Sequence, residues 1–252
     1  MNDRTKELSL HTKIIALLLV FAFLFFIAAC GNADSADTKT SGTADSAKLE
    51  PAEMSSTPEV QKTQSRQDKL LADGESGNGR AYTDLGRMYE QGNGVEQDYE
   101  KALEYYRLSA EAENPDFKGM RYAGLMYRDG SGVTQDAAEA AACFQLAAEA
   151  GDVSAAYFLG LLYEEGNGVD KSVDEAKKWY EKAVSSVDEF LSNTRNNGPD
   201  ELKQALCKLA EIALSDGDTN SAVKYYQYAV DLGWSAAGEK LLDLGITTEN
   251  GN

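Results

Sequence analysis

The side chains available for chemistry in this chain are mainly carboxylates, because 42 of its 252 residues are Asp or Glu and only 24 are Lys or Arg. Histidine, the commonest general base, occurs once, at His11. His11 lies in an N-terminal segment that we expect to be removed. The remaining chain would then have no Ser-His-Asp or Cys-His catalysis and no histidine-bearing zinc site. We therefore predict no catalytic residue, no metal and no cofactor.

A pair of carboxylates could still act as acid and base, as in glycoside hydrolysis. An enzyme that acts on the cell-wall glycan is therefore an alternative, and it would need two carboxylates facing each other across a groove. The abundance of acidic residues favours a solvated surface as the explanation of any one pair. The same acidity argues against a nucleic-acid partner, because neutralising phosphates requires clustered Lys and Arg.

Cys30 stands at the end of a segment that is typical of secretion signals. Residues 1–13 are weakly basic, and residues 14–29 form an unbroken apolar run that is shorter than the ~20 residues needed to cross a bilayer comfortably. The run ends in Ile27-Ala28-Ala29-Cys30, which resembles a bacterial lipobox. The resemblance implies a signal peptide over 1–29, a lipid on Cys30, and an extracytoplasmic protein anchored to a membrane of the bacterial envelope. An uncleaved signal anchor is the alternative.

Residues 31–64 contain almost no large apolar side chain and are rich in Ser, Thr, Ala and charged residues. Such a composition cannot form a core. We therefore expect residues 30–65 to comprise the lipidated cysteine and a disordered tether that holds the rest of the chain away from the lipid.

The elements that would position a binding site are indicated by a motif that occurs three times. Residues 85–95 recur at 123–133 and again at 159–169, each copy keeping the pattern Gly-x-x-Tyr-x-x-Gly-x-Gly-Val. Self-similarity at such a period predicts stacked supersecondary units, each too small to bury its own apolar face.

Each unit has the apolar spacing of two helices, which predicts a helical hairpin. A glycine lies inside the first helix of each unit, at Gly86, Gly124 and Gly160, where we expect it to let the second helix approach closely. Gly92 and Gly94 are expected to supply positive φ after that helix, with Val95 returning to the hairpin. A phosphate-binding loop is disfavoured, because no strand precedes these glycines.

The repeated pattern resembles the Sel-one-like repeat family, a branch of the tetratricopeptide repeats. The second copy departs from the pattern at Ala123 and at Cys143-Phe144, whereas the third matches it at Ala155, Leu159, Gly160, Tyr163, Gly166, Gly168, Val169, Ala176, Trp179, Tyr180 and Ala183. The resemblance covers about residues 66 to 243. It implies an all-α fold, an α-solenoid of stacked helical hairpins that binds other proteins, and it implies no enzyme activity.

The predicted solenoid spans residues 66–245 and is followed by a tail, 246–252. Between the third and fourth units we expect Val187, Phe190 and Leu191 to prolong a helix, residues 193–199 to form a loop, and Asp200 to cap the next helix. Two cysteines, Cys143 and Cys207, fall two units apart, and we expect free, mostly buried thiols. The predicted elements are an N-cap helix at 66–73, repeats at about 80–114, 117–150, 153–192 and 200–233, and a C-cap helix at 235–244.

A candidate binding site lies on the first helices, which line the concave surface in tetratricopeptide-like folds. Intervals of seven residues place cations on one face of each helix. We call these five residues the basic strip, and they suit a partner's carboxylates because arginine can bind them bidentately. Tyr157 and Leu161 are expected to form an apolar pocket beside it. The basic strip comprises Arg80, Arg87, Lys118, Arg121 and Arg128.

Together these features favour a non-enzymatic scaffold or adaptor that binds another protein, possibly through an acidic segment of that protein. Besides the glycan-acting enzyme, a structural subunit of an envelope assembly is a further alternative. Ordinary solvated helix residues are the alternative explanation of the basic strip.

Overall fold

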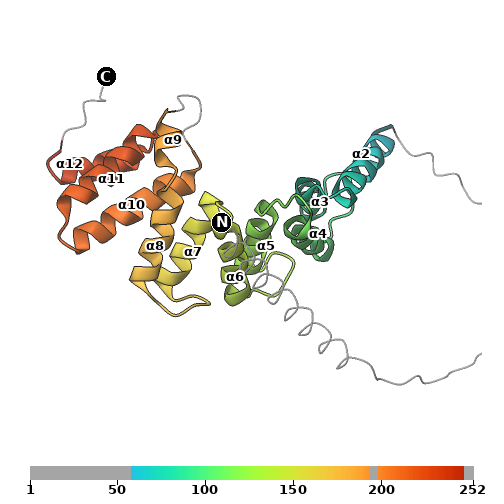
Figure 1. Cartoon of the computed structure of the whole chain (residues 1–252), viewed down its shortest axis with the longest axis horizontal. Helices are drawn as coiled ribbons and strands as arrows, with labels where there is room; N and C mark the ends of the chain where they lie inside the picture. The colour runs from blue at the N-terminus through green and yellow to red at the C-terminus, as the bar shows by residue number, and fades with distance from the viewer. Residues whose placement is uncertain (1–57, 193–197, 247–252) are drawn as a thin grey trace, which may run out of the picture. The chain divides into compact units, whose positions relative to one another are not determined.

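The computed structural model describes residues 58–192 and 198–246, and within these ranges the chain forms α-helices and no strand (Figure 1). The predicted signal peptide, Cys30, most of the tether and the end of the tail lie outside the described residues. The helices are α2 (Pro58–Glu75), α3 (Gly79–Gln91), α4 (Tyr99–Glu111), α5 (Lys118–Asp129), α6 (Ala137–Glu149), α7 (Val153–Glu165), α8 (Val173–Val184), α9 (Val187–Ser192), α10 (Asp200–Ser215), α11 (Thr219–Asp231) and α12 (Ser235–Asp243).

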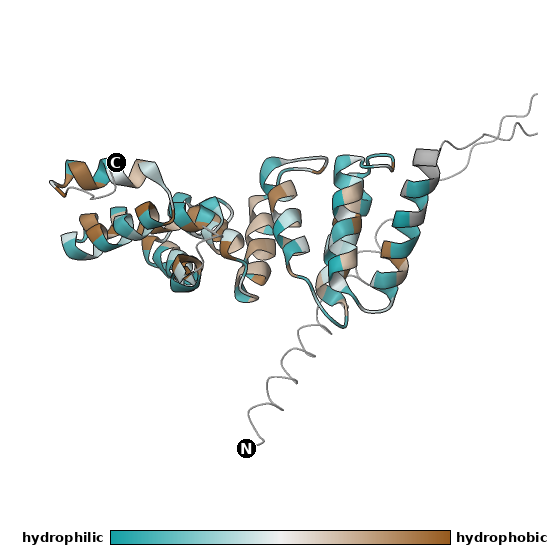
Figure 2. Ribbon diagram, turned by 90° about the horizontal axis from the view of Figure 1, so that it is seen from above, coloured by the Kyte–Doolittle hydropathy of each residue, from teal (hydrophilic) through white to brown (hydrophobic). Residues whose placement is uncertain are grey.

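The helices pair into four hairpins, α3–α4, α5–α6, α7–α8 and α10–α11, which we number units 1 to 4. Each second helix also packs against the first helix of the next unit, and α2 and α12 cover the two ends of the stack. Most helices carry both hydrophobic and hydrophilic residues, coloured brown and teal in Figure 2. The predicted all-α solenoid is confirmed. None of the described helices is long and apolar enough to cross a membrane.

In units 1 to 3, the glycine inside the first helix lies against an aromatic ring of the second helix, whereas α10 of unit 4 has Ala210 at the equivalent position. A Cβ atom on Gly160 would lie 2.4 Å from the Tyr180 ring, and one on Gly86 would lie 2.5 Å from the Tyr106 ring. In unit 2, a Cβ on Gly124 would lie 2.7 Å from the Phe144 ring. The expected close approach is therefore confirmed in all three units.

The Gly-x-Gly loop has one role that was predicted and one that was not. Gly166 ends α7 with a φ of 76°, as expected of a glycine at a helix C-terminus. Gly168 also has positive φ, but a Cβ there would lie 2.2 Å from the carbonyl carbon of Ala137, at the start of α6. The second glycine therefore also lets the loop pack against the preceding unit.

The core is built from the same slot in every second helix. Four aromatic side chains fill it, each at most 2% exposed: Tyr106, Phe144, Tyr180 and Tyr226. Two clusters of buried residues result, one across units 1 to 3 and one across unit 4 and α12. Val153, Val184 and Tyr225 pack against both clusters, so the apolar core continues through the junction.

The helix before the first repeat is longer than the sequence indicated. It begins at Pro58, so residues 58–65, expected in the tether, are helical. Proline is favoured at the first position of a helix, where its missing N–H has no intrahelical partner to lose. No further proline or glycine follows until Gly74, so the polar composition of this stretch concealed a continuous helix.

The junction between units 3 and 4 also differs from expectation. Helix α8 ends at Val184, and Val187, Phe190 and Leu191 belong to the separate short helix α9. The hydroxyl of Ser185 donates to the carbonyl of Lys182 at 2.8 Å, which accompanies the end of α8. Asp200 is the first residue of α10 rather than its cap, since Pro199 precedes it with extended backbone.

Candidate protein-binding surface

Three members of the basic strip are available to a partner. Arg80 and Arg87 on α3 and Lys118 on α5 are exposed. None of them forms an ion pair with any residue in the described ranges. Asn78 caps α3 by accepting from the N–H of Arg80 at 3.2 Å, which fixes where this row of side chains begins.

Arg87 and Arg121 come together on the ring of Tyr122. The guanidinium carbon of Arg121 lies 4.6 Å from the ring centroid, and that of Arg87 lies 5.6 Å from it. Cations over aromatic faces are attracted by the ring quadrupole. Both guanidinium groups therefore lie near the same ring, and the binding role of the basic strip stays a prediction.

Arg121 already has a carboxylate partner within the chain. Its Nε donates to Asp152 Oδ2 at 3.0 Å, and the two side chains are only 17% and 11% exposed. The other oxygen of Asp152 accepts from the N–H of Ala155 at 2.9 Å and so caps α7. Burial alone would lower the pKa of Arg121, but Asp152 more than offsets this and raises it. Arg121 therefore joins unit 2 to unit 3.

Arg128 is the second paired member of the strip. Its Nε and Nη2 donate to the two oxygens of Asp129 at 2.7 and 2.9 Å. Its guanidinium carbon also lies 4.8 Å from the centroid of the Phe158 ring on α7. Because the Arg128–Asp129 ion pair is partly exposed, a carboxylate of a partner could compete with Asp129 for the guanidinium group.

The two apolar residues that were predicted to form a pocket beside the strip lie mostly within the core. Tyr157 is 7% exposed, and its ring packs against the rings of Phe158 and Tyr180. Leu161 is half-buried against the same core cluster. The rings that lie closer to the strip are Tyr122 and Phe158, which the sequence analysis did not single out. Tyr122 and Phe158 are 36 residues apart and so occupy equivalent positions in units 2 and 3, and this repetition of an aromatic residue could have indicated them from the sequence.

Unit 2 differs from its neighbours in a matched pair of residues. In units 1 and 3 the buried tyrosine donates to a glutamate at the end of the first helix, Tyr106 to Glu90 at 2.5 Å and Tyr180 to Glu164 at 2.6 Å. In unit 2 the ring is Phe144, which has no hydroxyl to satisfy, and the glutamate position holds Arg128. Because Phe144 has no hydroxyl that needs an acceptor, this position can hold an arginine, which pairs with Asp129.

The described carboxylates with a clearly shifted pKa are all shifted downward. Acid–base catalysis by two carboxylates needs one of them held protonated. Burial raises the pKa of Glu164, but the hydrogen bonds from Tyr180 and Lys208 lower this pKa by more than burial raises it. The net shift is therefore downward. The shifts at Asp98, Asp129 and Asp218 are also downward. Within 58–192 and 198–246, no cluster of three or more His, Cys, Asp or Glu side chains could hold a metal ion.

Both cysteines of the repeats are free thiols in the described structure. Burial raises the pKa of Cys143 to about 12 and that of Cys207 to about 11. Each thiol is thus protonated near neutral pH and is a poor nucleophile. The prediction of free thiols is confirmed, and of the two Cys143 is buried and Cys207 is half-buried.

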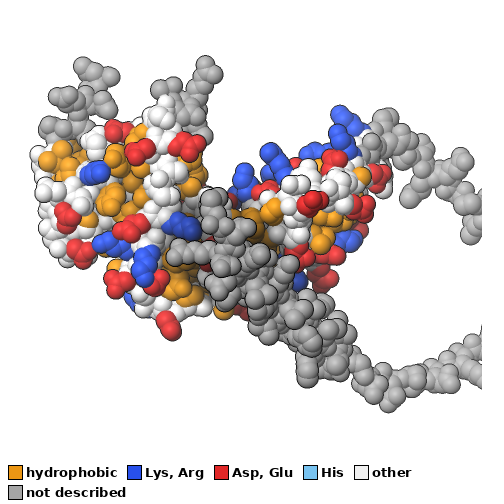
Figure 3. Space-filling view, in the orientation of Figure 1, with side chains coloured by type: hydrophobic (Ala, Val, Ile, Leu, Met, Phe, Trp, Pro, Cys, Tyr) orange, Lys and Arg blue, Asp and Glu red, His pale blue; other side chains and the backbone are white. Residues whose placement is uncertain are grey.

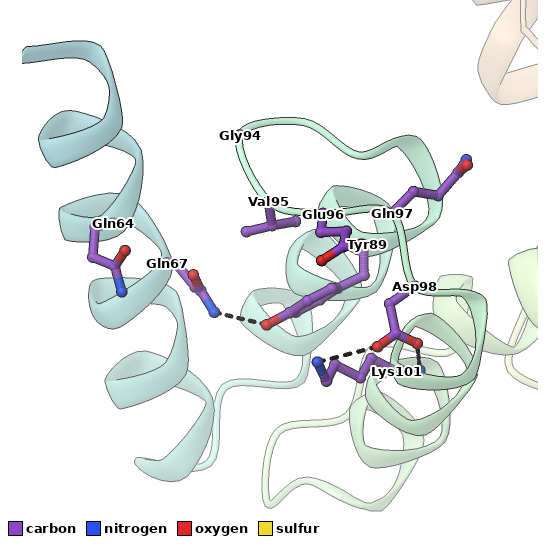
Figure 4. Close-up of a pocket in the computed structure, with 9 residues that line it drawn as sticks. All are labelled: Gln64, Gln67, Tyr89, Gly94, Val95, Glu96, Gln97, Asp98 and Lys101. Atoms are coloured by element: carbon purple, nitrogen blue, oxygen red, sulfur yellow. Dashed lines mark hydrogen bonds and ion pairs between the residues drawn. The ribbon is translucent and has the colours of Figure 1, made fainter. Parts of the chain in front are cut away.

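A polar cavity of about 490 Å³ lies between α2 and the loop of unit 1 (Figure 4). Gln67 Nε2 donates to the hydroxyl of Tyr89 at 2.7 Å across it. Lys101 pairs with Asp98 at 3.1 Å and lies 5.2 Å from the Tyr89 ring centroid. Gln67, Asp98 and Lys101 therefore already have partners, and the hydrogen bond from Gln67 to Tyr89 links α2 to unit 1.

Comparison with known proteins agrees with the repeat geometry. A family model described as the Sel1 repeat matches residues 79–114, 118–152, 153–186 and 204–234, which is more than half of the chain. The crystal structure of a Sel1 repeat protein from Oxalobacter formigenes is similar, with 27% identity, a TM-score of 0.57, and coverage of 75% of this chain and 78% of that one.

A second similar crystal structure is that of a protective antigen present in uropathogenic Escherichia coli strains, which displays an SLR fold. It is 27% identical, with a TM-score of 0.44, and the match covers 73% of this chain but only 45% of that one. A search of curated proteins gave no match.

Proposed function

This chain belongs to the Sel1 repeat family, whose members are generally protein-interaction scaffolds, and from this premise we propose that it is a non-enzymatic scaffold of the bacterial envelope. We propose that a lipid on Cys30 tethers it to a membrane and that its basic strip binds an acidic segment of another protein. The observation that carries the binding role is the exposure of Arg80, Arg87 and Lys118, none of which pairs with a carboxylate in the described ranges.

The geometry also decides which residues a test should change. Replacing Arg121 would leave Asp152 half-buried without its cation and would weaken the cap of α7, so lost binding could reflect lost structure. Arg80 and Lys118 make no such contact with a described side chain, and Arg87 makes only the contact with the Tyr122 ring. Binding can therefore be tested at these three residues with little disturbance of the stack.

We expect the triple variant R80E/R87E/K118E to lose capture of the partner, because reversed charges repel the carboxylates that the wild-type strip attracts. Capture by the wild type should weaken with added salt, since the contacts are exposed. A matched control is K182E/K224E/K240E, which makes the same charge change at three exposed lysines of α8, α11 and α12. Full recovery of the partner by the folded strip variant would eliminate the strip as the site.

The membrane tether is tested separately at Cys30, which lies outside the described residues. If the lipid is attached there, Cys30→Ser should block lipoprotein-type processing and move the chain out of the detergent phase during phase partitioning. Mass spectrometry of the N-terminus is the direct readout. Unchanged partitioning together with an uncleaved N-terminus in the wild type would contradict the lipid anchor.

A further inference from the structure

Helix α2 carries three more exposed cations beyond the basic strip. Lys62, Arg66 and Lys69 are spaced by four and then three residues, which places them on one face of the helix. None of them forms an ion pair with a residue that the structure describes. Asp73 continues this row at the C-terminal end of α2 but is half-buried. We call Lys62, Arg66 and Lys69 the α2 row.

The α2 row has a fixed place beside α3, because α2 is held against unit 1 at two points. Gln67 donates to the hydroxyl of Tyr89, and a Cβ on Gly74 would lie 2.5 Å from the Tyr82 ring, so the end of α2 rests directly on that ring. Gln67 points toward α3 across the cavity (Figure 4), and the α2 row lies on another flank of the helix.

Charge is segregated in this part of the molecule. Figure 3 shows Lys and Arg side chains gathered along the upper edge of the part that contains α2 and α3, with acidic side chains on its other sides. Helix α4 exposes three acidic residues, Glu100, Glu104 and Glu111, together with Lys101 and Arg107. A basic edge on a chain of net charge −18 creates a local potential opposite to that of the whole protein.

We infer that one acidic segment of the partner binds across both α2 and α3, so that the α2 row and the exposed part of the basic strip form a single surface. This inference rests on the proposed function and specifies the partner's chemistry, an extended segment that carries several carboxylates. The α2 row and the Arg80–Arg87 pair each span about 10 Å of helix, the length of about three extended residues. A single carboxylate would engage only one of these rows.

The test measures binding of a fluorescent polyglutamate peptide to the full chain in detergent micelles. The variant K62E/R66E/K69E should bind about tenfold or more weakly than the wild type, because three favourable contacts become repulsive. The control K182E/K224E/K240E should bind as the wild type does. Circular dichroism establishes that each variant is folded. Wild-type binding by the folded α2 variant would overturn the inference.

Two further arms separate this inference from the proposed function. If R80E/R87E/K118E loses the peptide while the α2 variant keeps it, the basic strip is a binding site and its extension onto α2 is wrong. If both variants keep it, both proposals fail. Binding of dihexanoyl-phosphatidylglycerol that requires the α2 row, without binding of polyglutamate, would assign the row to a lipid surface and also overturn the inference.

Discussion

At the scale of single residues, Gly160 decides how closely the two helices of unit 3 approach. A Cβ at this position would lie 2.4 Å from the Tyr180 ring, which is fully buried and whose hydroxyl donates to Glu164. Gly160→Ala should therefore destabilise the protein by about 1–3 kcal/mol through overpacking, despite the better helix propensity of alanine. Urea unfolding of wild type and variant measures the change.

Gly238 in α12 supplies a matched control. A Cβ there would meet only Val230 Cγ2, at 3.8 Å, which is ordinary van der Waals contact. Gly238→Ala should stabilise the protein by roughly 0.5–1 kcal/mol, since alanine favours helix more than glycine does. If both substitutions shift the free energy of unfolding in the same direction, the close contact at Gly160 is not what requires the glycine.

At the scale of helices, Phe144 and Arg128 of unit 2 can be replaced by the tyrosine and glutamate that units 1 and 3 have at the same positions. Phe144→Tyr should cost about 1–3 kcal/mol, because the new hydroxyl would be buried and would face Arg128 instead of an acceptor. Adding Arg128→Glu supplies the acceptor that units 1 and 3 already have, so the double variant should recover much of that loss. A double-mutant cycle on unfolding free energies measures the coupling. Additive effects would mean that the tyrosine–glutamate contact contributes nothing to pairing the two helices.

How much the sequence predicted also depends on scale. Repeated glycines and aromatic residues identified the hairpins and the role of Gly86, Gly124 and Gly160, because these residues occur at a constant period. The start of α2 at Pro58 and the break before α9 were missed, because both lie where no repeat provides a register. The pairing of Arg121 with Asp152 was also missed, since it joins helices of different units and depends on how those units pack.

At the scale of the whole molecule, the central claim is that the face formed by α3 and α5 binds a protein. The most direct test is photo-cross-linking, in cells that express the protein, from a benzoylphenylalanine placed at Arg87, compared with one placed at Leu146, a 47% exposed residue of α6. We expect one discrete cross-linked protein from position 87, lost in the R80E/K118E background, and none from position 146. A cross-link from position 146 alone would contradict it.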